Sequence, residues 1–134
     1  MIVTLPTNQE NPALSLSAIE RYSDGSGYAS LLSVRSGNYS AEYKFYFEDQ
    51  SLEAFVTQLE GMDSLLTGTA RLQPLYEPQY IQLACDNSGR VLVSGDLPEH
   101  DAHGQRLTFA FQTDQTVLKP LISSLRAVLA LAKA

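Results

Sequence analysis

Cysteine is almost absent from this chain, which carries a single one, Cys85, among 134 residues. One cysteine cannot form a disulfide within the chain, and a chain of this length can bury a core without such cross-links. Cys85 follows Ile81 and Leu83 at intervals of two residues, which places the three side chains on one face of a strand and predicts that Cys85 is buried. A catalytic thiolate, the alternative, would need a nearby histidine or a helix N-terminus.

Basic residues are also scarce, because nine Lys and Arg stand against 15 Asp and Glu, for a net charge of −6. Proteins that bind nucleic acids or anionic membranes do so through basic surfaces. The composition therefore argues against nucleic acid and membrane as partners.

Short catalytic motifs are missing too: the sequence has no Gly-x-Ser-x-Gly elbow, no phosphate-binding glycine loop and no His-Glu-x-x-His run. Its two histidines fall in one acidic segment, where His100, Asp101 and His103 offer nitrogen and oxygen ligands for a divalent metal. A solvated polar loop is the competing interpretation. We expect no enzyme, no metal and no cofactor.

Long hydrophobic runs are absent. Residues 1–6 lack the charges of a signal peptide, and the apolar C-terminal stretch is interrupted by Lys119, Pro120 and Arg126. The sequence therefore predicts a soluble cytoplasmic protein.

What the sequence does contain is a strand that leads directly into a helix. From Tyr39 to Phe47 aromatic and small residues alternate with Ser40, Glu42 and Lys44, which is the period of a half-buried strand. From residue 52 the period becomes that of an amphipathic helix, with Asp49 or Ser51 as its N-cap. The helical stripe consists of Leu52, Phe55, Val56 and Leu59.

Further strands follow from the same alternation between turn signals such as residues 23–27, 36–38 and 87–89. They are expected over 13–21, 28–35, 66–72, 79–86, 90–95 and 107–111. A second helix is predicted over 115–133, capped by Asp114 or Thr116, with a short irregular first turn because of Pro120.

These elements predict an α+β protein: one twisted antiparallel sheet of six or seven strands, with two helices at about 50–61 and 115–133 packed on one face. We expect a single domain, 1–134, whose residues 1–11 form a loose N-terminal segment. The stretches around Asp49 and Asp114 resemble each other, either because the chain consists of two similar units or because any strand-to-helix junction favours such residues.

Charge is unevenly distributed, since residues 42–63 carry a net −5 and residues 106–134 a net +3. Such acids form either a solvated face or a docking surface for a basic partner. Tyr46 points away from Phe45 and Phe47 and is either an interface anchor or part of a half-covered face. The candidate partner-binding residues are Glu42, Tyr46, Glu48, Glu53, Glu60 and Asp63.

Four short motifs occur in order along the chain: Phe-x-Phe-Glu-Asp-Gln-Ser-Leu-x-x-Phe at 45–55, Leu-Glu-Gly-Met at 59–62, Val-Leu-Val at 91–93 and Leu-x-Phe-x-Phe-x-x-Asp-Gln-x-x-Leu at 107–118. In this order, over about residues 27–130, the chain resembles the family of WapI-type bacterial immunity proteins. This resemblance implies an inhibitor that binds a cognate toxin, with a nuclease as one candidate, inside the producing cell. An acidic surface suits such a partner, because nuclease clefts are basic.

Two further possibilities stay open at this point. A ligand-binding protein could use an apolar pocket between the sheet and the helices. The chain could be a monomer or a homodimer that pairs through a sheet edge.

Overall fold

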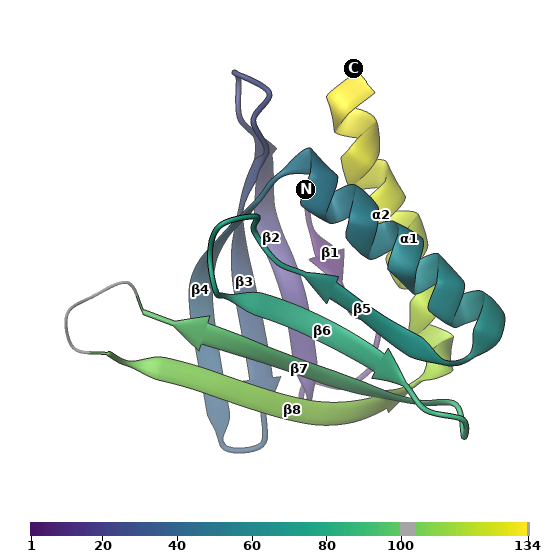
Figure 1. The fold of residues 1–134 in the computed structure, drawn as a ribbon. Coiled ribbons are helices and arrows are strands. Elements are labelled where there is room, and N and C mark those ends of the chain that lie inside the picture. The colour runs from purple at the N-terminus through teal and green to yellow at the C-terminus, as the bar shows by residue number, and fades with distance from the viewer. Residues whose placement is uncertain (100–103, 134) are drawn as a thin grey trace.

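The computed structural model describes residues 1–99 and 104–133, which form two four-stranded antiparallel sheets and two helices. The first sheet has the order β1-β2-β3-β4 and the second the order β5-β6-β7-β8 (Figure 1). The strands are β1 Val3–Thr4, β2 Ala13–Arg21, β3 Tyr28–Ser36, β4 Tyr39–Phe47, β5 Gly68–Leu72, β6 Tyr80–Cys85, β7 Arg90–Pro98 and β8 Arg106–Asp114. The helices are α1 Asp49–Leu65 and α2 Leu118–Leu129, with short 3-10 segments η1 Gln115–Val117 and η2 Ala130–Lys133 around α2.

The α+β class, the antiparallel pairing and both helices are as predicted, but the prediction of one sheet is wrong. Between β4 and β5 the chain runs through the 17 residues of α1, so β5 begins away from the edge of β4 and starts a second sheet. In Figure 1 the strands of the two sheets cross steeply. Each half of the chain is therefore four strands followed by a helix.

The N-terminal segment differs from the expected loose one. Val3 and Thr4 pair with Leu16 and Ser15 of β2, and Val3 and Leu5 are buried. Apolar side chains in this short stretch gain more from burial than the cost of ordering it.

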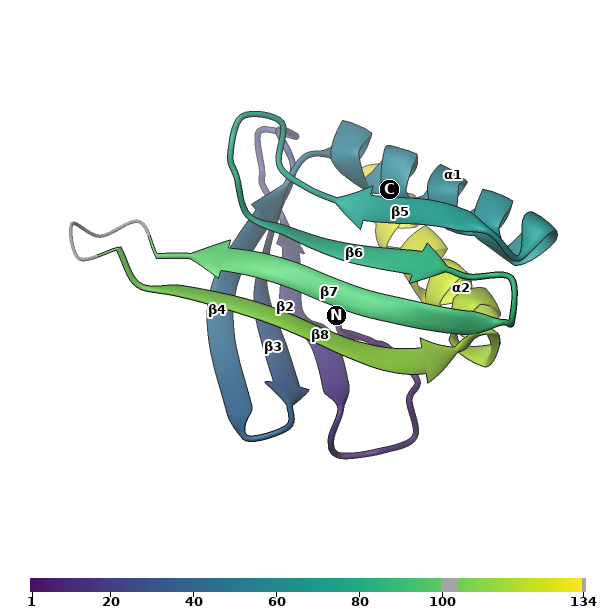
Figure 2. The same cartoon turned by 60° about the horizontal axis from the view of Figure 1, so that its bottom comes forward.

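The core lies where the two sheets meet both helices. Side chains from β1 and β2 (Val3, Leu14), from β6 (Ile81), from α1 (Phe55) and from α2 (Leu121) line one small cavity there. Figure 2 shows the second sheet in front of both the first sheet and the helices. The stripe that the sequence predicts on α1 and the buried side chains of α2 therefore belong to one core.

The two helices begin and end differently from each other. Helix α1 runs to Leu65, four residues beyond the expected end, and stops at Leu66 in the left-handed conformation (φ 55°). Helix α2 is preceded by the 3-10 turn η1, which confirms the irregular first turn expected beside Pro120. Among the described residues no helix is long and apolar enough to cross a membrane.

Candidate partner-binding site beside β4

The six candidate partner-binding residues do not form one surface. Glu42 and Tyr46 are exposed on the outward face of β4, because the alternation of that strand turns Tyr43, Phe45 and Phe47 into the core. The other four follow in the chain, at the start of α1 and along it: Glu48, Glu53, Glu60 and Asp63.

Three of these acids already have partners within the molecule. The Glu60 carboxylate lies 2.5 Å from the Arg126 guanidinium, and the Asp63 carboxylate lies 3.3 Å from the Lys119 ammonium. Glu48 accepts hydrogen bonds from the Ser51 hydroxyl at 3.0 Å and from the Leu75 N–H at 3.1 Å. The acidic first helix therefore meets the basic second helix inside the chain, which accounts for part of the uneven charge.

Glu42 and Glu53 are the predicted acids that stay exposed without a hydrogen bond or ion pair among the described residues. Tyr46 stacks on Tyr22 with ring centroids 6.4 Å apart, and both rings remain about 40% exposed (41% and 40%). A stacked, half-exposed tyrosine pair offers a preorganised apolar contact to a partner.

Glu42 borders two hollows, one on each side of β4. The first, of about 570 Å³, lies on the outward face of the first sheet, where register places Ser15, Ser33 and Glu42 in one row across three strands. The second, of about 410 Å³, separates β4 from the facing ends of β7 and β8. We call this second hollow the β4 groove; it is lined by Ala41, Glu42, Tyr43, Leu97, Glu99, Gln105, Arg106 and Leu107.

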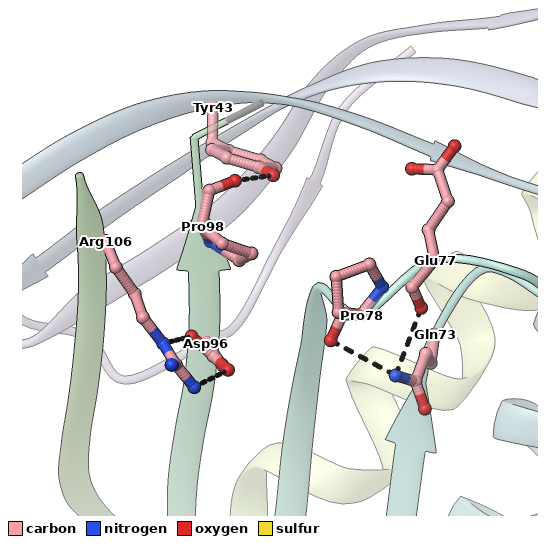
Figure 3. A network of polar contacts seen from close by, with 7 residues as sticks. All are labelled: Tyr43, Gln73, Glu77, Pro78, Asp96, Pro98 and Arg106. Carbon is pink, nitrogen blue, oxygen red and sulfur yellow. Dashed lines mark hydrogen bonds and ion pairs between the residues drawn. The ribbon is translucent and has the colours of Figure 1, made fainter. Parts of the chain in front are cut away.

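The β4 groove has an ordered polar base, shown in Figure 3. The Tyr43 hydroxyl donates to the Pro98 carbonyl at 2.6 Å and so joins the two sheets. On β8, Arg106 forms a two-pronged contact with Asp96, with Nε 2.6 Å from Oδ1 and Nη2 2.5 Å from Oδ2. The first contact fixes the end of β7 against β4, and the second fixes β8 against β7.

Carboxylates dominate the electrostatics of this groove. Burial raises the pKa of Tyr43, and the carboxylates of Glu99, Glu77 and Asp96 raise it further because they oppose a phenolate. Since the pair with Asp96 neutralises Arg106, Glu42 and Glu99 leave the groove acidic. A cationic side chain is the group that this environment favours.

Sequence reasoning found Glu42 but missed Tyr43, Glu99 and the Asp96–Arg106 pair as parts of a site. In the sequence, the segment from Asp96 to His103 indicates only a possible set of metal ligands. His100, Asp101 and His103 lie outside the described residues, so the metal hypothesis is untested there. The described part of the chain contains no group of three metal-ligating side chains.

A second polar cluster joins β2, β3 and α1. Arg21 Nη2 lies 2.6 Å from Asp49 Oδ2, and the Tyr28 ring lies beneath the guanidinium at 5.9 Å. Burial, and then the nearby Asp49 carboxylate, raise the pKa of Tyr28 to about 12. Burial opposes ionisation of Asp49, but the Tyr28 hydroxyl and the Arg21 guanidinium together hold its pKa below the ordinary value. The cluster locks the start of α1 onto the first sheet.

The one cysteine of the chain is not an activated thiol, and the pocket between the sheets and the helices is small. Cys85 is buried as predicted, and burial raises the pKa of its thiol, so it is protonated at neutral pH. The apolar pocket between sheets and helices holds only about 20 Å³, whereas small-molecule sites span roughly 300–1,000 Å³. This pocket is too small for a metabolite, so the alternative of a sheet–helix ligand site is not supported.

The chain belongs to the immunity protein WapI-like family, whose model matches residues 5–132. This membership confirms the resemblance found in the sequence and supports an immunity-type role. No curated protein matches the sequence significantly.

Two solved structures align with most of this chain. One is MRP1/MRP2 of Trypanosoma bruciei, with a TM-score of 0.53 and 10% identity over 99% of this chain and 82% of that one. Another is the CdiA-CT/CdiI toxin and immunity complex from Enterobacter cloacae, with a TM-score of 0.47 and 15% identity over 81% of this chain and 94% of the other. At such low identity the first of these likenesses shows a shared fold and nothing further.

Proposed function

We propose that this protein neutralises a cognate bacterial toxin by binding it in the cytoplasm of the producing cell. The observation that carries the proposal is membership of an immunity protein family over nearly the whole chain. Inhibition by binding requires a complementary surface and no catalytic group. A toxin with a basic cleft, such as a nuclease, suits a protein of net charge −6.

The acids that can reach a partner are those without an internal one. Glu42 on β4 and Glu53 on α1 meet this condition, and the Tyr22–Tyr46 pair adds an apolar contact beside β4. Glu48, Glu60 and Asp63 would have to give up internal contacts to bind a partner. We therefore place the binding surface around Glu42, with Glu53 as the test of a second, helical region.

The experiment is affinity capture of the tagged protein from its own organism, at low and then moderate salt, with bound proteins identified by mass spectrometry. A stoichiometric basic protein that salt releases is the expected result, because screening weakens charge–charge attraction. Coexpression of that protein with and without the immunity chain then tests neutralisation. Absence of any stoichiometric partner under conditions where the toxin gene is expressed contradicts the proposal.

Charge-reversal variants locate the surface. Glu42→Lys is expected to weaken capture by about tenfold or more, since it places a like charge against the partner. Glu53→Lys tests the helical region in the same way, and Glu10→Lys, at another exposed acid, is the matched control for net charge. Equal capture by wild type and by Glu42→Lys would move the binding surface away from β4.

A further inference from the structure

The outer edges of the two sheets are protected to different degrees. In β5, the Arg71 N–H donates to Gln58 Oε1 of α1 at 2.9 Å. In β8, the Ala110 carbonyl accepts the Ser36 hydroxyl at 3.3 Å. Strand β1 has two residues only. Over its nine residues β4 pairs with β3 on one side, without a bulge or a proline, and the described part of the chain supplies no strand on the other.

The direction of the free peptide groups of β4 follows from one hydrogen bond. The Phe45 carbonyl accepts the Ser30 hydroxyl of β3 at 2.8 Å, so the Phe45 peptide groups point toward β3. Peptide groups alternate in direction along a strand. Those of Ser40, Glu42, Lys44 and Tyr46 therefore point to the open edge, which is the arrangement that pairs with another chain.

The β4 groove runs beside this edge. A strand added to the edge would have one face against an apolar wall of the groove and the other face against an acidic rim. Leu97, which is buried, and Leu107, which is half-buried, form its apolar wall. Glu42 and Glu99 form its acidic rim. Lys44 is the exposed cation on the same outward face as Glu42, two residues further along.

We propose that β4 takes up an extended, basic segment of the protein partner as a fifth strand of the first sheet. This inference rests on the proposed function and specifies how the partner is held. Backbone hydrogen bonds to residues 40–46 supply affinity, and side chains alternating along the segment supply specificity. A Lys or Arg opposite Glu42 and apolar residues against Leu97 and Leu107 are the chemistry that the groove selects.

A second copy of this chain is a poorer occupant of the same edge. Edge-to-edge pairing would bring two acidic grooves together, each on a molecule of net charge −6. Like charges at an interface disfavour association. Self-association is nevertheless a defined outcome of the test below.

The test uses Lys44→Pro, with Lys44→Ala as its matched control. Because the Lys44 N–H points to the open edge, proline removes an edge donor without breaking a bond to β3, whereas alanine removes the charge and keeps the N–H. Circular dichroism and thermal melting verify that both variants fold. The probe is a phage-displayed library of random decapeptides, selected on wild type and depleted on Lys44→Pro.

The expected result is a set of peptides with alternating apolar residues and Lys or Arg. Synthetic versions should bind Lys44→Pro and Glu42→Lys at least about tenfold more weakly than wild type, and Lys44→Ala within about threefold. Peptides N-methylated at alternate amides should lose binding. In nuclear magnetic resonance spectra, the edge-facing amides of Ser40, Glu42, Lys44 and Tyr46 should shift and exchange more slowly with solvent, whereas the amides that already pair with β3 should keep their exchange rates.

Any of three results with the peptides or with the protein alone overturns the inference, and a fourth result, with the toxin, does so as well. Selection yields no peptides that depend on the edge, or N-methylated peptides bind as well as the parents, or sedimentation shows a wild-type dimer that Lys44→Pro abolishes. A toxin captured equally by wild type and Lys44→Pro also overturns it while leaving the proposed function intact. If edge-dependent peptides are found but no toxin is captured, the proposed function fails and the edge site stands.

Discussion

The two halves of the chain reach the same order of elements through different local contacts at their helix starts. Asp114, at the end of β8, accepts the Thr116 N–H at 2.9 Å and caps the turn before α2, as predicted. Asp49, in the matching position after β4, caps nothing; it pairs with Arg21, and the N-cap position is held by Glu48 without a side-chain bond. The prediction that Asp49 or Ser51 caps α1 is therefore wrong.

This difference shows how similar sequence signals acquire different roles. In the second half the acid serves its own helix, whereas in the first half it ties the helix to β2 and β3. The edges differ as well, because β8 and β5 receive side-chain hydrogen bonds from elsewhere in the chain while β4 borders an open groove. The open edge of the first half is where we propose that the partner binds.

The largest effect should come from breaking the core that both halves share. Phe55 on α1 and Leu121 on α2 line the same cavity, and both are buried. Phe55→Ala should cost about 3–5 kcal/mol and Leu121→Ala about 2–5 kcal/mol in free energy of unfolding. Denaturant unfolding followed by fluorescence and by circular dichroism should give one coincident transition for each variant. Two separate transitions would show that the halves fold independently.

Next in size is the alkaline sensitivity of the Arg21–Tyr28–Asp49 cluster. The pKa of Tyr28 is about 12 when folded and about 10 when unfolded, so the unfolded chain loses its proton first as pH rises. The contribution of Tyr28 to the free energy of unfolding is fully present below pH 10 and is lost as the pH rises toward 12. At pH 11 the loss from this group is about 1.4 kcal/mol. Comparing urea unfolding at pH 8 and pH 11 in wild type and Tyr28→Phe checks this. An equal loss in both proteins would contradict it.

A smaller effect is expected from opening the protected edge of β5. Gln58→Ala removes the acceptor of the Arg71 N–H and should cost about 0.5–1.5 kcal/mol. Hydrogen exchange at the Arg71 amide should accelerate, because this edge N–H then lacks an acceptor, as the edge N–H groups of β4 do. Thr57→Ala, at a neighbouring exposed position of α1, is the control and should leave that amide unchanged.

The smallest effect concerns the charges between the helices. Glu60→Lys places two cations together and should destabilise by about 0.2–1 kcal/mol, because both side chains are solvent-exposed. The exchanged pair, Glu60→Lys with Arg126→Glu, should recover most of that loss in a double-mutant cycle. A zero coupling energy would show that the contact contributes nothing to stability.

The sequence predicted secondary structure well where periodicity was strong. The strand 13–21 and the strand 39–47 have the expected bounds, and the helical stripe of Leu52, Phe55, Val56 and Leu59 is buried as proposed. It failed at β1, since two residues are too short to show a period, and it merged the two sheets into one. Alternation reveals which face of a strand is buried but not which strands are neighbours.

For the site, the sequence identified Glu42 and Tyr46 as exposed residues on β4, because they alternate with the aromatic residues Tyr43, Phe45 and Phe47 and so lie on the opposite face of the strand. It could not separate Glu53 from Glu60 or Asp63, since the cations that neutralise the latter two are more than 50 positions away. Nor could it bring Glu99 beside Glu42. That proximity depends on how the second sheet crosses the first.

The amino-acid sequence by itself determined the elements, the buried faces, the buried thiol and the family, because these depend on local periodicity and on residue types in order. Only the tertiary structure decided that the chain has two sheets, that the acids of α1 meet the cations of α2, and that β4 is left open beside an acidic groove. These features depend on contacts between residues far apart in the chain, which the local pattern of side chains does not specify.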